Sequence, residues 1–299
     1  MNTIEIEKEV EEYMESGLYP VVDEHLFDKV YDYKPSLAAT NKKDFLLEEY
    51  NEYLQLLTSQ QPEILEAFLT ILKNYDIKDN QKLEREQEFL IDIQNFLLNR
   101  IIPHAIDFLM ENKDKPLTKE NMKMAHGLLM EGTSNITADN YLFRKHNNKV
   151  VGTYKNGERI IYYFPPKVEK IEVLAEKFLE YYNDENLNKD IFTTPIIAHG
   201  LLATMQIFDD GNTRLARLLQ HAKLHKQTNE ILGYDFKLPI IYNTRTYYPQ
   251  RGKYREFTVK MATNATNEVF DEWCIFNYNL FLNQIYKSEE KVRQLSLIR

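Results

Sequence analysis

The sequence has few of the features that mark secreted, membrane-spanning or loosely linked proteins. Its single cysteine, Cys274, excludes a disulfide within the chain, which is typical of a reducing compartment. Nine glycines leave little material for flexible linkers, and no apolar run reaches the roughly 18 residues that a membrane helix needs. The start, MNTIEIEKEV, lacks the basic and apolar regions of a signal peptide. We therefore expect a cytoplasmic protein without a membrane span, with specialised secretion as the alternative.

The composition is that of an ordinary globular protein with an acidic surface. Hydrophobic residues make up 43% of the 299 positions and charged residues 28%. The formal net charge of −9 argues against a broad nucleic-acid-binding surface. We therefore expect no nucleic-acid partner, and the length allows one large domain or two small ones.

Apolar residues recur at helical spacing through most of the chain, which predicts a mainly α-helical fold. Thr118 is a good helix N-cap, and Pro103 should interrupt a long apolar-periodic stretch. The segment from Tyr234 to about Lys253 lacks the pattern and is predicted to be irregular. The predicted helices cover residues 3–16, 42–57, 61–75, 83–111, 118–130, 195–205, 213–225, 258–263 and 268–287.

One β-hairpin stands out from this helical pattern. Two short runs rich in β-branched and aromatic residues, 150–154 and 159–163, flank Lys155-Asn156-Gly157-Glu158. Asn-Gly between such runs is a strong hairpin signal. An isolated hairpin is only marginally stable.

The most informative segment runs from Gln206 to Arg217, QIFDDGNTRLAR, between two predicted helices. Gly211-Asn212 is expected to break the chain and start the second helix, with Asn212 as N-cap. The first N–H groups of that helix would attract an anion. Arg214 and Arg217 are three residues apart, so they share a helix face, and arginine binds phosphate oxygens in a bidentate manner. Asp210, just before the helix, is placed to hold Mg²⁺ against those phosphates.

This segment resembles the signature of the Fic family, His-x-Phe-x-Asp/Glu-Gly-Asn-x-Arg-x-x-Arg. Thr213 stands where Gly is commoner. Residues 140–144 with 150–152, residues 164–166 with the amphipathic stretch that follows, residues 243–248, and Trp273 also fit the family pattern over about 118–285. The positions that match the signature are Phe208, Asp210, Gly211, Asn212, Arg214 and Arg217.

The resemblance implies a Fic-type helical bundle and a transferase that moves AMP from ATP, with Mg²⁺, to a Ser, Thr or Tyr hydroxyl of a protein. UMP, phosphocholine and phosphate transfer are known alternatives in the family. The resemblance implies a core at 116–230, between an N-terminal helical region, 1–115, and a C-terminal helical extension, 231–299. It assigns the nucleotide site to Gly211, Asn212, Thr213, Arg214 and Arg217, the metal to Asp210, and catalysis to the His position together with Asp210, Asn212 and Arg217.

The hairpin, at about 149–164, corresponds to the family's flap, which holds the target by strand addition. Its expected docking residues are Val151, Gly152, Ile160, Ile161 and Tyr162. A purely structural hairpin is the alternative. The resemblance also leaves self-modification and a homo-oligomer open.

Gln206 occupies the position of the family's catalytic histidine. That histidine is the general base, and a carboxamide cannot take a proton near neutral pH. We therefore expect weakened transfer, or a pseudoenzyme that binds nucleotide or protein without turnover. His199, seven residues upstream, is expected to be a packed helix histidine rather than a substitute base.

An inhibitory motif that many Fic proteins carry, Ser/Thr-x-x-x-Glu-Gly/Asn, is not intact. The nearest segment is Ser36–Asn41, in which Thr40 stands where glutamate should be. If this near-match were the inhibitory element, Thr40 could not form the ionic lock with Arg217.

Overall fold

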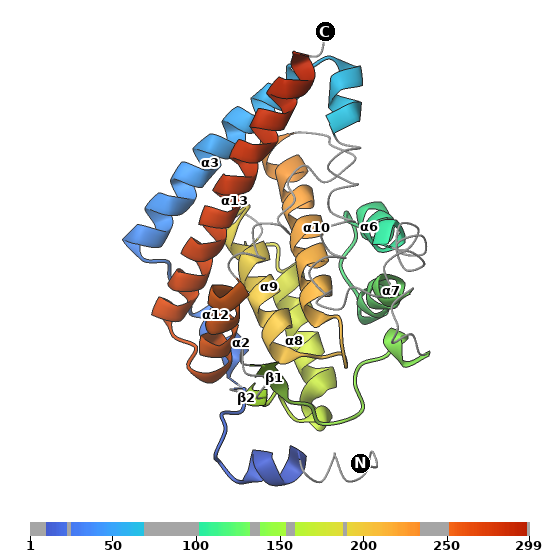
Figure 1. Cartoon of the computed structure of the whole chain (residues 1–299), viewed down its shortest axis with the longest axis vertical. Coiled ribbons are helices and arrows are strands. Elements are labelled where there is room, and N and C mark those ends of the chain that lie inside the picture. Colours follow the sequence, from blue (N-terminus) through green and yellow to red (C-terminus); the bar gives the residue numbers. More distant parts are fainter. Residues whose placement is uncertain are drawn as a thin grey trace.

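The chain folds into a mainly α-helical bundle with one small β-hairpin, as predicted (Figure 1). The computed structural model describes residues 10–22, 25–68, 102–131, 138–153, 159–187, 190–233 and 251–297. Residues 10–15 and 62–68 are also helical. The named elements are α2 (Leu26–Tyr31), α3 (Leu37–Thr58), α6 (Ile102–Glu111), α7 (Lys119–Met130), β1 (Val150–Thr153), β2 (Arg159–Tyr163), α8 (Ile171–Asn183), α9 (Thr193–Met205), α10 (Asn212–Leu232), α12 (Arg251–Thr263) and α13 (Asn267–Ser296).

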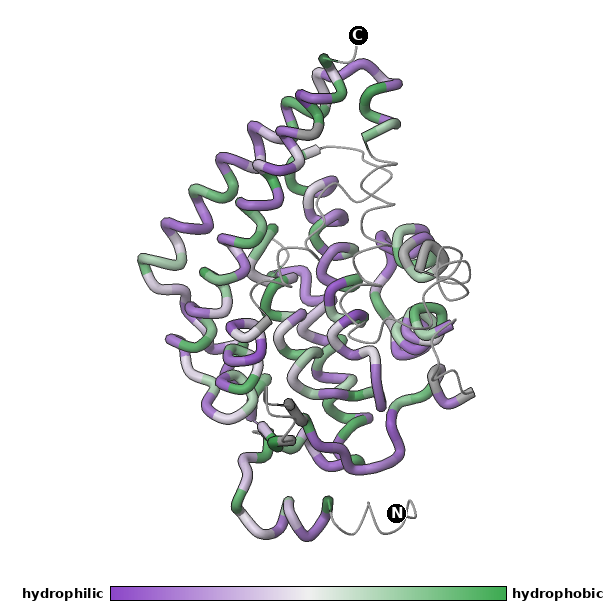
Figure 2. Tube along the Cα trace, viewed as in Figure 1, coloured by the Kyte–Doolittle hydropathy of each residue, from purple (hydrophilic) through white to green (hydrophobic). Residues whose placement is uncertain are grey.

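Helix α9 lies at the centre of the bundle and every one of its residues is buried. It packs against α10, α8, α12 and α13, while α3 lies outside against α13 (Figure 1). Helices α6 and α7 pack on the other side of α10. Apolar and polar positions alternate along α3 and α13, as expected for outer helices with one buried face (Figure 2).

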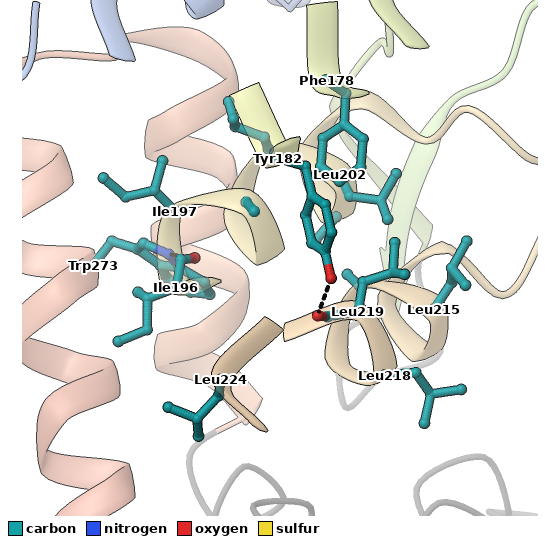
Figure 3. Close-up of a cluster of buried hydrophobic side chains, with 14 of the residues drawn as sticks. Phe178, Tyr182, Ile196, Ile197, Leu202, Leu215, Leu218, Leu219, Leu224 and Trp273 are labelled. Carbon is teal, nitrogen blue, oxygen red and sulfur yellow. Dashed lines mark hydrogen bonds between the residues drawn. The ribbon is translucent and has the colours of Figure 1, made fainter. Parts of the chain in front are cut away.

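The core between these helices is apolar and contains a few anchored aromatic residues (Figure 3). Trp273 of α13 is fully buried and its indole Nε1 donates to the carbonyl of Ile196, 2.8 Å away. Tyr182 of α8 donates its hydroxyl to the carbonyl of Leu219, also 2.8 Å away. Such bonds satisfy the polar end of a buried aromatic ring and fix how the helices pack on α9 and α10. Cys274, next to Trp273, is buried in the same core.

Side-chain caps and glycines determine where several helices begin and end. Thr118, the predicted cap, accepts from the backbone N–H of Asn121 at 3.1 Å. Helix α10 runs to Leu232, beyond the predicted end at His225, because Gly233 with φ 71° is the first left-handed stop. His225, the last residue of the predicted helix and in that position a favourable charge at a helix C-terminus, is instead buried inside α10, so that interpretation is wrong.

Two other boundaries also differ from the sequence prediction. Helix α12 begins at Arg251, so residues 251–253 are helical rather than irregular. Helix α13 continues to Ser296 as one helix of 30 residues, because its apolar face keeps packing on α3. The predicted helical residues 69–75 and 83–101, and the segment 234–250 with its Arg-x-Tyr-Tyr match, lie outside the described residues.

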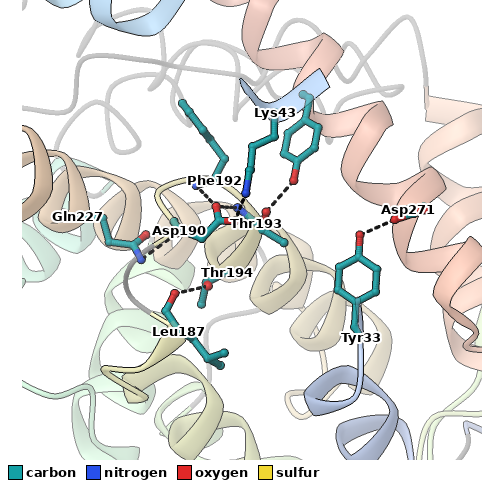
Figure 4. A network of polar contacts seen from close by, with 10 residues as sticks. Tyr33, Lys43, Leu187, Asp190, Phe192, Thr193, Thr194, Gln227 and Asp271 are labelled. Atoms are coloured by element: carbon teal, nitrogen blue, oxygen red, sulfur yellow. Dashed lines mark hydrogen bonds and ion pairs between the residues drawn. The ribbon is translucent and has the colours of Figure 1, made fainter. Parts of the chain in front are cut away.

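A polar network anchors the start of α9 (Figure 4). The carboxylate of Asp190 accepts from the backbone N–H groups of Phe192 and Thr193 at 3.0 and 2.8 Å. Lys43 of α3 reaches the same carboxylate at 2.8 Å, and Gln227 of α10 donates to the Asp190 carbonyl at 3.2 Å. The network therefore joins three helices at one end of the central helix.

Ser36–Asn41, the near-match to an inhibitory motif, forms the cap and first turn of α3. The Ser36 hydroxyl accepts from the backbone N–H of Ala39, and the Ser36 backbone N–H donates to Asp271 of α13, each at 3.2 Å. These contacts give the segment a structural role in seating α3 against α13.

The predicted hairpin is present as an antiparallel pair, with Val151 opposite Ile161 and Gly152 opposite Ile160. Its turn, residues 154–158, lies outside the described residues. Beyond β2, Phe164 exchanges two backbone hydrogen bonds with the N-terminal segment, donating to Pro20 and accepting from Val22. That end of the hairpin is therefore already paired by the chain itself. Within the described ranges, no helix is both long and apolar enough to cross a bilayer.

Candidate active site

The segment singled out in the sequence forms a tight loop between α9 and α10. Helix α9 stops because Gln206 adopts a left-handed conformation, φ 49° and ψ 54°. Gly211, with φ 77°, redirects the chain into α10. A Cβ at Gly211 would lie 2.7 Å from the Met130 sulfur and 2.9 Å from His126 Nε2, so only glycine fits there.

Asn212 braces the loop from inside rather than capping the helix. Gly211 is the N-cap and Asn212 the first helical residue, which corrects the sequence expectation. The Asn212 side chain, 2% exposed, accepts from the Phe208 N–H at 2.9 Å and donates to the Phe208 carbonyl at 2.8 Å. Among the described residues no side chain caps α10, so its first N–H groups remain directed at the loop.

Phe208 is fully buried within the loop, and His126 of α7 holds it in place. The His126 ring, 2% exposed, stacks on the Phe208 ring with centroids 3.8 Å apart and planes 8° apart. Its Nε2 donates to the carbonyl of Asp210 at 2.7 Å. A residue more than 80 positions earlier therefore fixes the acidic part of the loop.

We expect His126→Leu to lower the free energy of unfolding by about 1–3 kcal/mol, because it removes both the hydrogen bond to the Asp210 carbonyl and the flat ring stacked on Phe208. Hydrogen exchange at residues 208–211 should also become faster. His126→Gln is the matched control, because glutamine can keep a hydrogen-bond donor but loses the flat stack on Phe208. Its free energy of unfolding and its exchange rate should lie between those of the wild type and His126→Leu. Unfolding in urea and exchange mass spectrometry measure both effects. Unchanged exchange in His126→Leu would mean that the loop holds itself.

Arg144 holds the other end of the loop. Its Nε donates to the carbonyl of Gln206 at 2.7 Å, and its backbone N–H donates to the carbonyl of Ile207 at 3.0 Å. Further guanidinium bonds go to the carbonyls of His146 and Pro166. The segment after α9, the loop before β1 and the segment after β2 are thereby tied to one side chain.

Asp210 and Arg214, predicted for metal and phosphate, meet in the structure. One Asp210 oxygen lies 3.2 Å from Arg214 Nη2, and the other accepts from the Gly211 N–H at 2.6 Å. The Asp210 side chain is 56% exposed, so its oxygens are accessible from solvent. Within the described part of the chain, no group of three or more acidic, His or Cys residues is arranged to hold a metal. A single carboxylate suits Mg²⁺ that arrives with phosphates and water, which is how this ion usually binds.

Arg217 lies deeper, one turn into α10, and is only 6% exposed. Burial, and next the charge of Arg217, lowers the pKa of His199 to about 3 and that of His221 to about 4. Both imidazoles therefore stay neutral and add no positive charge beside Arg217. Since Arg217 carries its charge in a poorly hydrated place, an anion that reaches it would be strongly attracted.

His199 is a packed helix histidine, as the sequence predicts. It is buried, with Nδ1 2.6 Å from Gln220 Oε1 and Nε2 2.9 Å from the Tyr254 hydroxyl. Its ring also contacts Trp273 edge-on. Both nitrogens are engaged in the core, so His199 does not replace the missing base.

The Gln206 carboxamide is held in place by the loop itself. Its Nε2 donates to the Ala203 carbonyl at 2.5 Å, and its Oε1 accepts from Asn212 Nδ2 at 3.2 Å. Gln206 is the one non-glycine residue with a positive φ among those described. The side chain therefore closes the end of α9 and has no proton to exchange near neutral pH.

The hairpin is tied to the last turn of α9, just before the loop. Thr204, next to the loop, accepts from the Tyr163 hydroxyl of β2 at 3.2 Å through its carbonyl. Ile160, Ile161 and Tyr162 are partly exposed. Arg255 of α12 lies 5.6 Å from the Tyr162 ring centroid, and Ile161 packs on the small apolar cluster of the N-terminal segment.

Comparison with known proteins points to the Fic family. The model of the Fic/DOC family matches residues 116–224. A solved Fic domain containing signaling protein from Bacteroides thetaiotaomicron VPI-5482 is 15% identical, with a TM-score of 0.60 over 83% of this chain and 97% of that one. A Fic family protein from Desulfovibrio desulfuricans G20 is 19% identical, with a TM-score of 0.57 over 85% and 76%. No curated protein matches this sequence.

Proposed function

Since the chain carries a Fic domain at residues 116–224, we propose that it is a nucleotide-binding Fic protein that transfers AMP from ATP to a protein hydroxyl, slowly because of Gln206. The observation that carries this proposal is the loop at the start of α10. There a helix N-terminus without a side-chain cap, the exposed carboxylate of Asp210 and two buried arginines lie within three turns of chain.

The loop supplies three independent attractions for a triphosphate. The first-turn N–H groups of α10 favour phosphate oxygens, and the helix dipole adds to this. Arg214 would exchange Asp210 for a phosphate, and Arg217 would meet the phosphate that reaches deepest. Asp210, once released, would hold Mg²⁺, which neutralises charge on the phosphates. Asn212 supports this work indirectly by keeping the loop in shape.

The transfer itself requires a proton acceptor. The target oxygen would bond to the α-phosphorus as the bond to pyrophosphate breaks, and the hydroxyl proton must leave at the same time. Gln206 can orient the hydroxyl but cannot accept this proton. Binding should therefore be retained while turnover is slow.

The target would approach along the hairpin. Strand addition binds an extended segment through main-chain hydrogen bonds and leaves its side chains to set specificity. The hairpin suits this role because its base is tied to Thr204, close to the loop, while Ile160 and Tyr162 stay partly exposed. The Phe164 end is occupied by the N-terminal segment, so the target would pair elsewhere on the hairpin.

We expect Arg217→Ala to weaken Mg²⁺·ATP binding about 10–100-fold, because it removes charge-assisted bonds to phosphate. Calorimetric titration of the full chain measures this directly. Arg293→Ala, which removes an exposed arginine of α13, is the matched control and should bind as the wild type does. Equal affinity in Arg217→Ala, or no heat from the wild type at all, contradicts the proposal.

A second function is favoured by the way the Gln206 amide is tied down. With Nε2 on Ala203 and Oε1 on Asn212, the residue acts as a loop clamp. The chain would then be a pseudoenzyme that binds nucleotide or grips a protein without modifying it. Robust, Asp210-dependent modification by the wild-type chain would exclude this function.

A further inference from the structure

A small cleft opens between α6, α7, the end of α8 and the middle of α10, with a volume of about 60 Å³. Lys223 of α10 lies on the wall of this cleft, nine residues after Arg214 of the loop site. Nine residues are two and a half helical turns, so the two side chains lie on roughly opposite faces of α10. The cleft is therefore separate from the loop site. Its wall contains one acidic residue, Glu185, and four lysines, which are Lys113, Lys115, Lys223 and Lys226.

Lys223 is the fixed centre of this lysine cleft. It is only 3% exposed, its Nζ donates to the carbonyl of Tyr182, and it lies 5.0 Å from the centre of that ring. Tyr182 is itself anchored on Leu219 (Figure 3). Since neither side chain is mobile at the surface, the charge of Lys223 is held in a defined place on the wall.

The environment of Lys223 opposes its charge. Burial, and next the neighbouring charge of Lys226, lowers the pKa of Lys223 to about 8, although Glu230 and Asp184 act in the other direction. A buried cation that is repelled by a second cation is stabilised when an anion comes close. The cleft therefore has an electrostatic reason to take up negative charge, in a chain whose formal net charge is −9.

The other three lysines have partners that solvent can replace. Lys226 lies 3.6 Å from Glu230, Lys113 lies 2.8 Å from Asp114, and Lys115 bonds to the Asn112 side chain at 3.2 Å. The side chains of Glu230 and Asp114 are 50% and 71% exposed, so these ion pairs contribute little. The lysines can therefore turn toward an anion at small cost.

We propose that the lysine cleft binds a small anion of the phosphate type. A cavity needs about 10–15 Å³ to hold one water molecule. The 60 Å³ of the cleft therefore hold about four to six atoms of that size, and a phosphate has five heavy atoms. The rest of the wall includes Leu117, Leu219 and Ala222, and the Asn183 amide beside them already bonds to the Leu117 backbone through both its oxygen and its nitrogen. The ligand is thus free phosphate, or a phosphomonoester whose remainder projects into solvent.

The test is an NMR titration of the full chain, labelled at the lysine ε-carbons, with inorganic phosphate. Lys223→Met assigns the Lys223 signal. We expect that signal to shift with saturation in the wild type and, with a dissociation constant within twofold, in Arg217→Ala, which disables the loop site. In the double variant K115Q and K226Q the dissociation constant should rise at least tenfold. Lys115 is exposed and Lys226 partly exposed, so both replacements should leave the fold intact.

Two further arms identify the source of the phosphate and guard against a salt effect. If glycerol 3-phosphate binds at least as tightly as inorganic phosphate, the ligand of the cleft is a phosphomonoester. If only inorganic phosphate binds, the ligand is the free ion. Sodium chloride at equal ionic strength should not shift the Lys223 signal. The proposal is overturned if chloride gives the same shift, or if the double variant binds phosphate as the wild type does. Loss of the shift in Arg217→Ala alone also overturns it, by assigning the phosphate to the loop site.

Discussion

Gln206→His is expected to raise the rate of AMP transfer about 10²–10⁴-fold, the contribution that a positioned general base typically makes. An imidazole with a pKa near 6.5 can take the hydroxyl proton at neutral pH, and a carboxamide cannot. The backbone at this position is left-handed, φ 49°. Histidine is among the non-glycine residues that adopt this region more often, so the substitution should be tolerated.

The replacement also releases the two bonds that hold the glutamine amide. The Ala203 carbonyl loses its donor, Gln206 Nε2, and Asn212 Nδ2 loses its 3.2 Å bond to Gln206 Oε1. Asn212 keeps both of its bonds to the Phe208 backbone. We expect a cost of about 1 kcal/mol in stability, which is too small to unfold the chain. The imidazole would then be free to point toward the target rather than close α9.

The measurement is transfer of label from ATP marked at the α-phosphate, to the chain itself and to the proteins of a lysate. Gln206→Met is the matched control, because it has similar size and no base. Binding of Mg²⁺·ATP should be measured on the same samples. If Gln206→His binds nucleotide but transfers no label to the chain itself or to lysate proteins, lack of a base is not what limits transfer. That result would favour the pseudoenzyme function.

The local part of the site follows from the sequence because it depends on near neighbours. Gly211 must adopt positive φ, and Phe208 must be buried between two helices. The hairpin is equally local, since Asn-Gly and alternating residues specify it. Helix ends are harder to predict. Helix α13 continues for as long as α3 packs against it and does not end where its own helix propensity falls.

The support of the site does not follow from the sequence. His126 and Arg144 contact the loop from positions more than 60 residues earlier, and the spacing of their neighbours does not predict either contact. Arg144 lies in a segment, residues 140–144, that fits the family pattern, but the pattern does not say what its side chain binds. The lysine cleft is similar, because its four lysines come from separate segments that only the packing of α6 against α10 brings together. Such long-range groupings depend on tertiary structure that periodicity does not contain.

Arg144→Met is expected to lower the free energy of unfolding by about 4 kcal/mol, from three carbonyls at about 1–2 kcal/mol each. Arg144 is 3% exposed, and burial lowers its pKa to about 10, with Asp209 and Glu169 acting in the opposite direction. At neutral pH it stays charged, so its bonds to Gln206, His146 and Pro166 are charge-assisted. Methionine fills part of the space and satisfies none of these oxygens.

A loss of this size should lower the midpoint of thermal unfolding by about 10 °C in a domain of this length. Arg144→Lys is the informative control, because lysine keeps the charge but cannot reach three separate carbonyls. Its midpoint of thermal unfolding should fall less than that of Arg144→Met. Since the three carbonyls belong to the motif loop, the segment before β1 and the segment after β2, exchange should accelerate in all three together. A midpoint within about 2 °C of the wild type would mean that water or a neighbouring donor satisfies these carbonyls as well as the guanidinium does.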